Sequence, residues 1–389
     1  MARSIGAGDD RLVYWDEDRI EAGTRCDPWV KPDWDPLLFR TLGGLVGASA
    51  FPLEAMGGVA SSVSDVPIEP GAIERLLLDI AQTSRPKHIP LILSHRRERA
   101  AAMKGGAAIP PAPAKWPSVS IIIPTRDKAE LLAACLNGID QTDYPGPIQI
   151  VVVDNGSSNL EALKLIESLT EDPRALVLRD DGPFNFPRLN NLAASVAEGE
   201  LLCLLNNDVE PLDREWLTRL VRYAVQDGVG AVGAQLVYPS GRIQHAGVVV
   251  GLGGAAGHLQ KGVHPDEERF WTWHAVTREV SALTAAVLVV KKKDYVEVDG
   301  FDEDFAVAFN DVDFCLRLKQ RSLRNIYVAD VRLLHRESES RGNDRSPVQV
   351  RRFADELARL QERWGTEDYF DPHFSPLFSR LVERCVLAP

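Results

Sequence analysis

Apolar and polar residues alternate along residues 117–225 in a way that predicts a layered α/β domain. Apolar runs at residues 119–123, 148–153, 175–178 and 201–205 have the length of buried strands. Between and after them, apolar residues recur every three or four positions over residues 129–139, 160–169, 189–197 and 216–225, which indicates helices. Continuous apolar strands separated by helices are typical of a mostly parallel sheet covered on both faces.

Beyond Gly230 the pattern changes to short strands among glycine-rich loops. Strands are predicted at residues 231–238, 247–250, 286–290 and 325–334, and a helix is predicted at residues 310–319. Residues 346–365 predict a capped amphipathic helix, because Ser346 and Gln349 can form a capping box around Pro347. Its apolar face predicts docking onto the main body, with a dimer contact as the alternative; the face comprises Val350, Phe353, Leu357, Leu360 and Trp364.

Residues 103–117 are rich in Ala, Gly and Pro, a composition that predicts a linker. We therefore expect an N-terminal module at residues 1–102, the linker at 103–117, a main domain at 118–342 and a C-terminal helical extension at 343–389.

Composition restricts the class of protein further. The net charge of −12 argues against nucleic acid as the main partner. No apolar run approaches the roughly 20 residues that span a bilayer, and the N-terminus lacks the apolar core of a signal peptide. Five cysteines without a CxxC pair predict buried thiols in a reducing compartment. These features predict a cytoplasmic enzyme or binding protein.

Three polar clusters directly follow predicted strands, where ligands bind in parallel sheets. They are Thr125-Arg126-Asp127, Asp154-Asn155-Gly156-Ser157-Ser158 and Asn206-Asn207-Asp208. One Asp after a strand often only caps the next helix, but three such clusters match the needs of a nucleotide-sugar. They offer acceptors for a base and ribose, and Asp208 offers a carboxylate for Mg²⁺ or Mn²⁺ on a diphosphate.

A fourth cluster places Asp311 and Asp313 at the start of the helix predicted at residues 310–319. Helix capping is the structural alternative, more so for Asp313 than for Asp311. The functional interpretation is that Asp311 acts as a general base toward an acceptor hydroxyl. His335 closes the last predicted strand, and that position favours a metal or phosphate role over a purely structural one.

Gly251, Gly253 and Ala256 fit a variant of the dinucleotide-binding fingerprint. Residues 258–265 do not continue as a helix, and no acidic residue closes a second strand about 20 positions on. We therefore interpret the segment as a loop near the acceptor, together with His245, Gly247 and His258.

The segments VSIIIPTRD, IVVVDNGSS, LLCLLNNDVEP and FNDVDFCLRL resemble the inverting family 2 glycosyltransferases, which have the Rossmann-like α/β fold called GT-A. FNFPRLNNLAA, GAVGAQLVYPSGRIQHAGVVVGLGGAAGH and VDGFDEDFAVAFNDVDF resemble its bacterial branch that builds O-antigens and other surface polysaccharides, rhamnosyltransferases among them. The resemblance covers residues 118–342 in order. It implies a GT-A sheet flanked by helices, with Mn²⁺ or Mg²⁺ as cofactor.

The resemblance also implies roles for individual residues. Asp311 would be the catalytic base, and Asp208 and His335 would bind the metal. The donor would be contacted by Pro124, Thr125, Asp127, Asp154, Asn155, Arg188, Asn191 and Asn207. Two positions depart from the family pattern, because Asn206 and Asn310 stand where acidic residues are common. Each replacement removes a negative charge, which is expected to weaken metal affinity.

The N-terminal module repeats features of the main domain. Asp16-Glu17-Asp18 corresponds to the metal motif that ends in Asp208 in the main domain. LSHRRE resembles the segment LLHRES that contains His335. The module resembles the later half of a second glycosyltransferase domain without its nucleotide-binding half, so we predict a partial, degenerate GT-A-like module. A helical cap with an acidic turn is the alternative.

The predicted function is transfer of a sugar, with inversion, from a UDP- or dTDP-linked donor to a glycan or lipid-linked glycan in surface polysaccharide synthesis. Peripheral association with the inner face of the membrane and a homodimer remain open. The alternative from another class is a non-catalytic member that binds a nucleotide-sugar or glycan in an assembly complex. A nucleotidyltransferase would need a glycine-rich basic loop after the first strand, and PTRDKAE is not one. Trp271 and Trp273 are candidates for stacking on an acceptor sugar.

Overall fold

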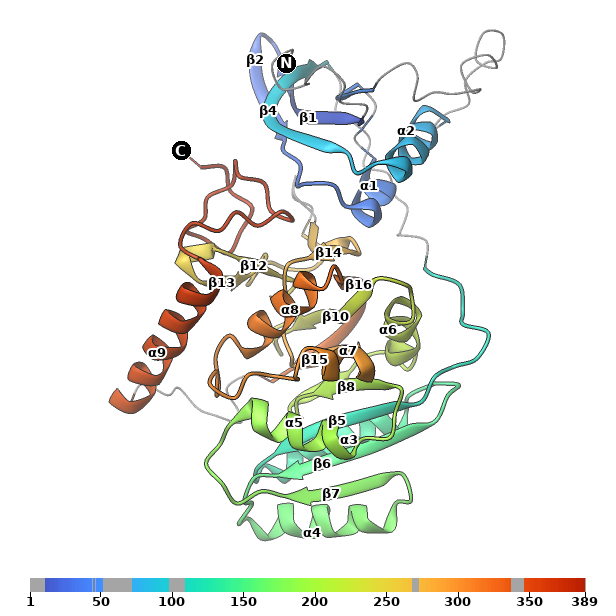
Figure 1. The fold of residues 1–389 in the computed structure, drawn as a ribbon, viewed down its shortest axis with the longest axis vertical. Coiled ribbons are helices and arrows are strands. Elements are labelled where there is room, and N and C mark those ends of the chain that lie inside the picture. The colour runs from blue at the N-terminus through green and yellow to red at the C-terminus, as the bar shows by residue number, and fades with distance from the viewer. Residues whose placement is uncertain are drawn as a thin grey trace. The chain divides into compact units, whose positions relative to one another are not determined.

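The structure is a computed structural model that describes residues 11–43, 45, 47–51, 72–97, 109–267, 273–336 and 346–388. The chain forms two compact units, which are coloured by residue number in Figure 1. The smaller unit comprises Met1–Ala108, Phe370–Ser379 and Val386–Pro389. The larger unit comprises Ile109–Tyr369 and Arg380–Cys385.

The first half of the larger unit has the strand and helix alternation that the hydrophobic pattern predicts. Its elements are β5 (Val119–Thr125), α3 (Ala129–Asp140), β6 (Ile148–Asp154), α4 (Leu160–Ser168), β7 (Ala175–Arg179), α5 (Phe186–Val196), β8 (Leu201–Leu205) and α6 (Trp216–Ala224). Helix α5 begins three residues earlier than predicted. Asn185 caps it by accepting a hydrogen bond from the Arg188 N–H at 3.0 Å, and Pro187 occupies its first turn.

The second half consists mostly of short strands, as predicted. Its elements are β9 (Val209–Pro211), β10 (Val229–Val237), β11 (Ile243–His245), β12 (Val248–Val250), β13 (Ala256–His258), β14 (Arg278–Val280), β15 (Val287–Lys291), α7 (Lys292–Glu297), α8 (Asn310–Gln320), β16 (Arg324–His335) and α9 (Pro347–Trp364). Single 3₁₀ turns lie at Leu169–Glu171, Leu252–Gly254 and Trp273–Ala275.

The central sheet is mixed, whereas the sequence pattern predicted a mostly parallel one. Its order is β14-β16-β10-β15-β8-β5-β6-β7. Strands β8, β5, β6 and β7 run parallel, but β15 lies antiparallel between β8 and β10. An apolar run indicates that a strand is buried, but it does not indicate the direction of the strand. The reversal at β15 therefore could not be seen in the sequence.

The segment that fits the dinucleotide fingerprint forms a β-hairpin. Val248 to Val250 pair in antiparallel fashion with Ala256 to His258. Gly251, Gly253 and Gly254 all have positive φ in the turn between the strands. These residues therefore close a hairpin, whereas a dinucleotide-binding loop opens a helix.

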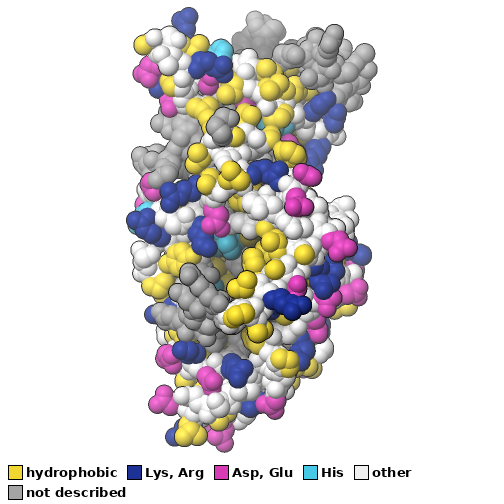
Figure 2. Space-filling view, turned by 90° about the vertical axis from the view of Figure 1, so that its left-hand side faces the viewer, with side chains coloured by type: hydrophobic (Ala, Val, Ile, Leu, Met, Phe, Trp, Pro, Cys, Tyr) yellow, Lys and Arg dark blue, Asp and Glu magenta, His cyan; other side chains and the backbone are white. Residues whose placement is uncertain are grey.

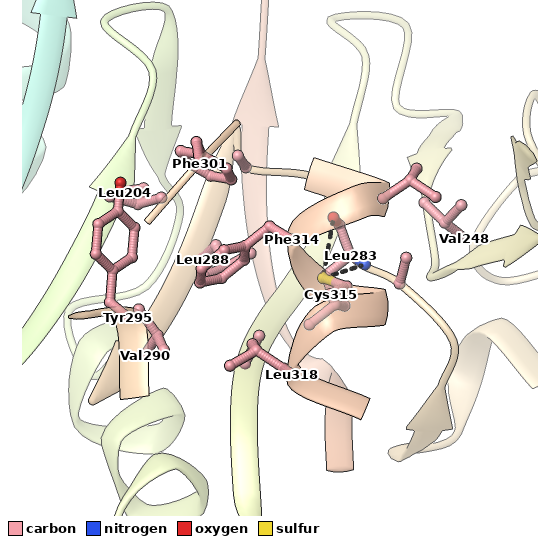
Figure 3. Close-up of a cluster of buried hydrophobic side chains, with 14 of the residues drawn as sticks. Leu204, Val248, Leu283, Leu288, Val290, Tyr295, Phe301, Phe314, Cys315 and Leu318 are labelled. Atoms are coloured by element: carbon pink, nitrogen blue, oxygen red, sulfur yellow. Dashed lines mark hydrogen bonds between the residues drawn. The ribbon is translucent and has the colours of Figure 1, made fainter. Parts of the chain in front are cut away.

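The main core lies on the face of the sheet that α5 and α8 cover. Leu204, Leu288 and Val290 from the sheet contact Phe314 of α8 and Tyr295 of α7 in one buried cluster (Figure 3). Each fully buried side chain of this size stabilises the fold by roughly 1.5–3 kcal/mol. Cys135, Cys203 and Cys315 are buried free thiols, as predicted, and Cys315 donates to the carbonyl of Leu283.

Helix α9 belongs to the larger unit, which confirms the predicted docking. The predicted capping box is present, because the Ser346 N–H donates to Gln349 Oε1 at 3.1 Å. Leu360 is fully buried against the main core. Val350 and Phe353, nearer the start of the helix, are 61% and 48% exposed, so only part of the predicted apolar face is covered.

The carboxylate of Asp313 joins α8 to α9. It is fully buried and accepts from Arg317 Nε at 2.8 Å, Arg363 Nη1 at 2.9 Å and Trp364 Nε1 at 3.0 Å. Asp313 therefore has a structural role, which was the alternative that the sequence left open.

Replacing Asp313 with Asn is expected to lower the stability of the larger unit by about 2 kcal/mol, because two arginines lose their buried counter-charge. The carboxamide oxygen can still accept from Trp364, so the change isolates the effect of charge. The matched control is Asp304→Asn, whose ion pair with Arg359 is 65% and 42% exposed and is expected to contribute less than about 1 kcal/mol. Urea unfolding measures both, and equal losses would contradict the prediction.

The smaller unit has a sheet of its own. Its elements are β1 (Val13–Glu21), β2 (Thr24–Trp29), α1 (Pro36–Leu42), β3 (Ser49–Ala50), α2 (Ala72–Thr83) and β4 (Lys87–Arg96). Strand β1 pairs with β2 and β3 in antiparallel fashion and with β4 in parallel fashion. The alternative of a helical cap is therefore wrong. The first part of the predicted linker, residues 103–108, lies outside the described residues.

Acidic and basic side chains are interspersed on the face that Figure 2 shows. Among the described residues, no helix is both long enough and apolar enough to cross a bilayer.

Candidate active site

Strands β5 and β6 bring the first two predicted clusters together at their carboxyl ends. Thr125 is the last residue of β5 and pairs in register with Asp154, the last residue of β6. The Asn155 N–H donates to the carbonyl of Thr125 at 2.8 Å. All three residues are buried. Pro124 is buried one position earlier in β5.

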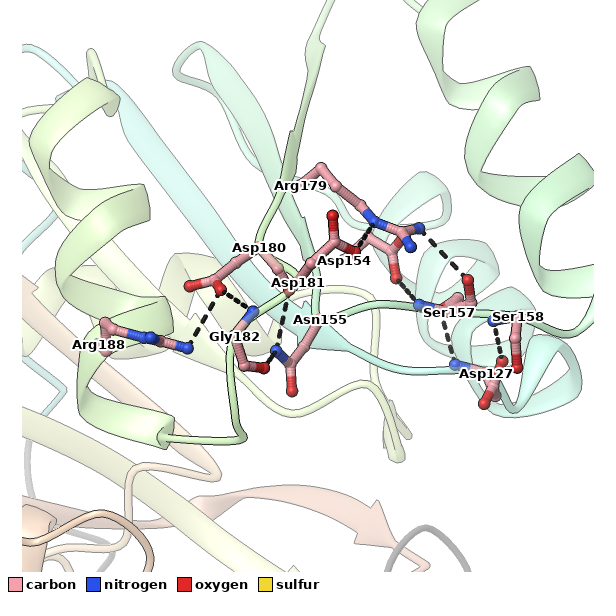
Figure 4. Close-up of polar contacts among 10 residues, drawn as sticks. All are labelled: Asp127, Asp154, Asn155, Ser157, Ser158, Arg179, Asp180, Asp181, Gly182 and Arg188. Atoms are coloured by element: carbon pink, nitrogen blue, oxygen red, sulfur yellow. Dashed lines mark hydrogen bonds and ion pairs between the residues drawn. The ribbon is translucent and has the colours of Figure 1, made fainter.

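Asp127 and Asp154 shape the loops around this edge (Figure 4). Asp127 Oδ1 accepts from the backbone N–H groups of Ser158 and Asn159, both at 2.8 Å. These two hydrogen bonds lower the pKa of the Asp127 carboxyl. Asp154 accepts from the Ser157 N–H at 2.8 Å and pairs with Arg179.

Asn155 has one buried atom that is suited to a ligand. Its Nδ2 donates to the carbonyls of Asp180 at 3.0 Å and Gly182 at 2.9 Å. Its Oδ1 is buried and accepts no hydrogen bond within the described structure. Because an unpaired buried acceptor is costly, a donor group such as the N–H of a nucleobase would satisfy it.

Arg188 bonds the same loop after β7 that Asn155 bonds. Its Nη2 donates to Asp180 Oδ1 at 3.1 Å and to the Pro183 carbonyl at 2.7 Å. The sequence argument missed Arg179, Asp180 and Gly182. The signal was available, since Arg179 ends β7 and Asp-Asp-Gly directly follows it, just as the other clusters follow their strands.

Asn191 has contacts that differ from the donor-binding role predicted for it. Its Oδ1 accepts from the Tyr295 hydroxyl at 2.6 Å and the Phe301 N–H at 2.9 Å. Its Nδ2 donates to the Phe301 carbonyl at 2.9 Å and to Glu303. The amide therefore joins α5 to the loop that follows α7, because an Asn on a helix face can bond the backbone of a neighbouring segment.

The third predicted cluster contacts the first. Asn207 Nδ2 donates to the Thr125 hydroxyl at 3.0 Å, and both side chains are buried. The carboxyl ends of β5 and β8 therefore share one polar edge with β6. The backbone of Asn206 is also engaged, because its N–H donates to the Ala286 carbonyl at 3.0 Å.

Asp208 and His335 meet at this edge, as predicted. Strand pairing sets His335, the last residue of β16, opposite Val209. His335 Nε2 lies 3.1 Å from Asp208 Oδ1, and both side chains are buried. Gln244 Oε1 lies 2.7 Å from His335 Nδ1 and fixes the orientation of the ring.

The donor atoms of this pair fit a divalent cation. With the Nδ1 hydrogen donated to Gln244, Nε2 presents a lone pair to a carboxylate oxygen, so the pair needs a proton or a cation between the two acceptors. A carboxylate and a neutral imidazole suit Mn²⁺, and Mg²⁺ takes one or two carboxylates with phosphate oxygens and water. Among the described residues, no group of three His, Cys, Asp or Glu side chains could hold a metal.

Asp311 is held at the start of α8 with its carboxylate fixed by backbone donors. Oδ2 accepts from the Ala285 N–H at 3.2 Å, and Oδ1 accepts from the Val312 N–H at 2.9 Å. Burial raises the pKa of Asp311 more than these hydrogen bonds lower it. A carboxylate with a raised pKa is the form that suits a general base.

The segment around Ala285 connects Asp311 to the chain close to Asp208. The Ala285 N–H donates to Asp311, and the Ala286 carbonyl accepts from Asn206, two residues before Asp208. Asp311 and Asp208 are thus placed by adjacent residues of one chain segment. The sequence could not show this link, because it uses backbone groups from a third region.

The structure gives a reason for Asn at position 310, where an acidic residue was expected, and the sequence did not reveal it. Its Nδ2 donates to the carbonyls of Phe305 at 3.2 Å and Val307 at 2.9 Å. A carboxylate cannot donate these bonds, so an acidic residue could not replace Asn310 in this arrangement. The loop before α8 therefore requires an amide at this position, and the expected effect of the lost charge on metal affinity stays a prediction.

Only some of the residues predicted to lie near the acceptor are brought together. His245 Nδ1 lies 2.9 Å from His258 Nδ1, so these two predicted residues do meet. Burial lowers the pKa of His245 well below its usual value. Trp273 is only 2% exposed, so the prediction that it stacks on a sugar is wrong, because its ring fills the interior. Trp271 lies outside the described residues.

Comparison with known proteins identifies the domain that carries this site. Residues 120–271 match the model of glycosyl transferase family 2. This match lies within the larger unit and covers less than half of the chain. The match includes the residues from β5 to His258, and Asp311 and His335 lie beyond its end.

Two relatives cover most of the chain. One is the protein y4gI of Sinorhizobium fredii, 35% identical over 95% of the chain and 45% of its own length. The other is the O-antigen biosynthesis protein RfbC of Myxococcus xanthus, 36% identical over 86% of the chain and 29% of its own length. The chain thus spans less than half the length of these relatives.

The fold of the larger unit is also similar to that of a solved structure. A mannosyltransferase of Pyrobaculum calidifontis, solved with GDP-Man and Mn²⁺, superposes with a TM-score of 0.50 over 70% of this chain and 71% of its own, at 20% identity. The predicted α/β fold of the GT-A class is confirmed.

Proposed function

We propose that the family 2 domain transfers a sugar from a nucleotide-sugar to a hydroxyl of a glycan or lipid-linked glycan, with inversion at the anomeric carbon. Asp311 accepts the proton of the acceptor hydroxyl. The hydroxyl oxygen attacks the anomeric carbon as the bond to the nucleoside diphosphate breaks. One displacement of this kind inverts the configuration.

The donor lies along the polar edge formed by β5, β6 and β8. Asn155 Oδ1 accepts from the base, and Asp127 and Asp154 hold the loops that surround the nucleoside. Thr125 and Asn207, which bond one another, line the path toward the diphosphate. Asp208 and His335 hold Mn²⁺ or Mg²⁺, which when bound neutralises charge on the departing diphosphate.

The observation that carries this proposal is the placement of Asp311 relative to the Asp208–His335 pair. Residues 285 and 286 bond both Asp311 and the chain two residues before Asp208. A base and a cation-binding pair that are held by one chain segment suit a displacement at the anomeric carbon. The bond to the acceptor oxygen forms there on one side as the bond to the diphosphate breaks on the other.

The relative named for O-antigen biosynthesis supports a place in bacterial surface polysaccharide synthesis. A rhamnosyl or other hexosyl donor on UDP or dTDP remains our proposal, and the solved mannosyltransferase makes GDP worth including in any screen.

A nucleoside diphosphate and Mn²⁺ together are expected to raise the thermal unfolding temperature of the protein, because ligands that bind only the folded state stabilise it. The screen compares UDP, dTDP and GDP, and their sugars, with and without Mn²⁺. Inorganic diphosphate with Mn²⁺ is the control for unspecific binding. Failure of every nucleotide to exceed that control would contradict the proposed function.

A further inference from the structure

The start of α8, which carries Asp311, has an unusual backbone. Phe309 occupies the N-cap position with φ of 63°, in the left-handed region that aromatic residues rarely adopt. No side chain caps the first turn of α8 from that position. A strained conformation persists only where the surrounding structure holds it. The support for α8 must therefore come from outside the helix.

Helix α9 provides this support through Glu356. Glu356 is buried, and its two oxygens accept separately from the N–H groups of Val307 at 3.0 Å and Ala308 at 2.9 Å. Phe353, one turn earlier in α9, packs on Phe309 with 5.4 Å between the ring centroids. Glu356 and Phe353 thus hold the three residues that precede Asn310.

Further contacts fix α9 along the same segment. Three of its residues bond acidic side chains on both sides of Asp311: Arg359 pairs with Asp304 at 3.0 Å, Arg363 pairs with Asp302 at 2.7 Å and Asp313 at 2.9 Å, and Trp364 donates to Asp313. These contacts keep α9 in place without Glu356. Loss of the Glu356 carboxylate should therefore release the backbone at residues 307–308 and leave the helix docked.

We propose that Glu356 is a positioning residue, which holds residues 307–309 in the conformation that presents Asp311 to the acceptor hydroxyl. This inference rests on the proposed function. Glu356 touches no reacting atom and acts through the backbone of Val307 and Ala308. A neutral amide cannot replace it, because only a carboxylate offers an acceptor oxygen to both N–H groups.

Glu356→Gln tests the proposal in the full chain. We expect kcat to fall about tenfold or more, because one backbone N–H faces the amide nitrogen and Asp311 loses its orientation. The KM for the donor and the affinity for nucleoside diphosphate should stay unchanged, since the donor edge is untouched. The matched control is Glu362→Gln, an exposed position of the same helix, which should behave as the parent.

Hydrogen exchange provides a readout that does not require activity. Peptides covering residues 302–313 should exchange faster in the Gln variant than in the parent and the Glu362 control. Unchanged kcat or unchanged exchange would overturn the inference. A parent without turnover would instead overturn the proposed function, and exchange alone would then decide whether Glu356 holds the loop. If the Gln variant does not fold, Glu356→Asp, which shortens the reach by one methylene, is measured with the same expectations.

Discussion

Asp311→Asn is expected to lower kcat by about 10²–10⁴-fold, the range that general bases contribute. The carboxamide oxygen can keep only one of the two hydrogen bonds, that from Ala285 or that from Val312, and the carboxamide cannot accept a proton from the acceptor hydroxyl. Nucleoside diphosphate affinity should stay at the parent value, since Asp311 lies outside the donor edge. Radiolabelled sugar transfer measures the first quantity and calorimetry the second.

The pH dependence of the parent provides an independent check on Asp311. Burial raises the pKa of this carboxyl above the ordinary value of about 3.9. Asp311 is therefore fully deprotonated, and able to act as a base, only at a pH above that raised pKa. We expect kcat/KM to rise with pH through that raised pKa and then level off. The residual activity of the Asn variant should not show this rise with pH. A variant that retains both the rate and the rise with pH would exclude Asp311 as the base.

Asp208→Asn is expected to lower activity at least about 100-fold and to raise the Mn²⁺ concentration needed for half-maximal activity. The change removes the carboxylate that faces His335, so a cation at this pair loses its charged ligand. The diphosphate would then leave without the neutralisation that a metal supplies. Activity measured across a Mn²⁺ titration reports both effects.

Glu210→Gln is the matched control for Asp208, because it removes an acidic group two residues along. Glu210 pairs with Arg336 at 2.6 Å and does not take part in the His335 contact. This variant should keep the Mn²⁺ dependence of the parent. An Asp208 variant with a parent-like Mn²⁺ titration would show that the pair does not hold the metal.

The hydrophobic pattern missed β9, β11, β13, β14 and α7 of the larger unit, but the elements that it predicted agree with the structure to within about three residues. The reason is that strand and helix burial repeat with different periods, and each period is local to its own segment. Strand direction is not local. The antiparallel β15 between β8 and β10 therefore had no sequence signal, and neither did the hairpin partner of Val248 to Val250.

Candidate site residues were found where a strand end coincides with a polar cluster. This rule correctly brought Thr125, Asp154 and Asn155 to one edge, and it brought Asp208 to His335. The assignment of Trp273 did not use this rule and was wrong, because an aromatic side chain in a loop gives no sign of whether it is buried.

The sequence by itself determined the α/β class of the larger unit, the edge of the sheet that holds the polar clusters and the free state of the buried thiols. Each follows from short-range patterns of apolar and polar residues. Only the tertiary structure decided what supports Asp311: the Ala285 N–H, the amide of Asn310 and the Glu356 carboxylate of α9. These contacts join backbone groups to side chains far apart in the chain, and any residue type can supply a backbone group. The pattern of residue types therefore could not reveal them.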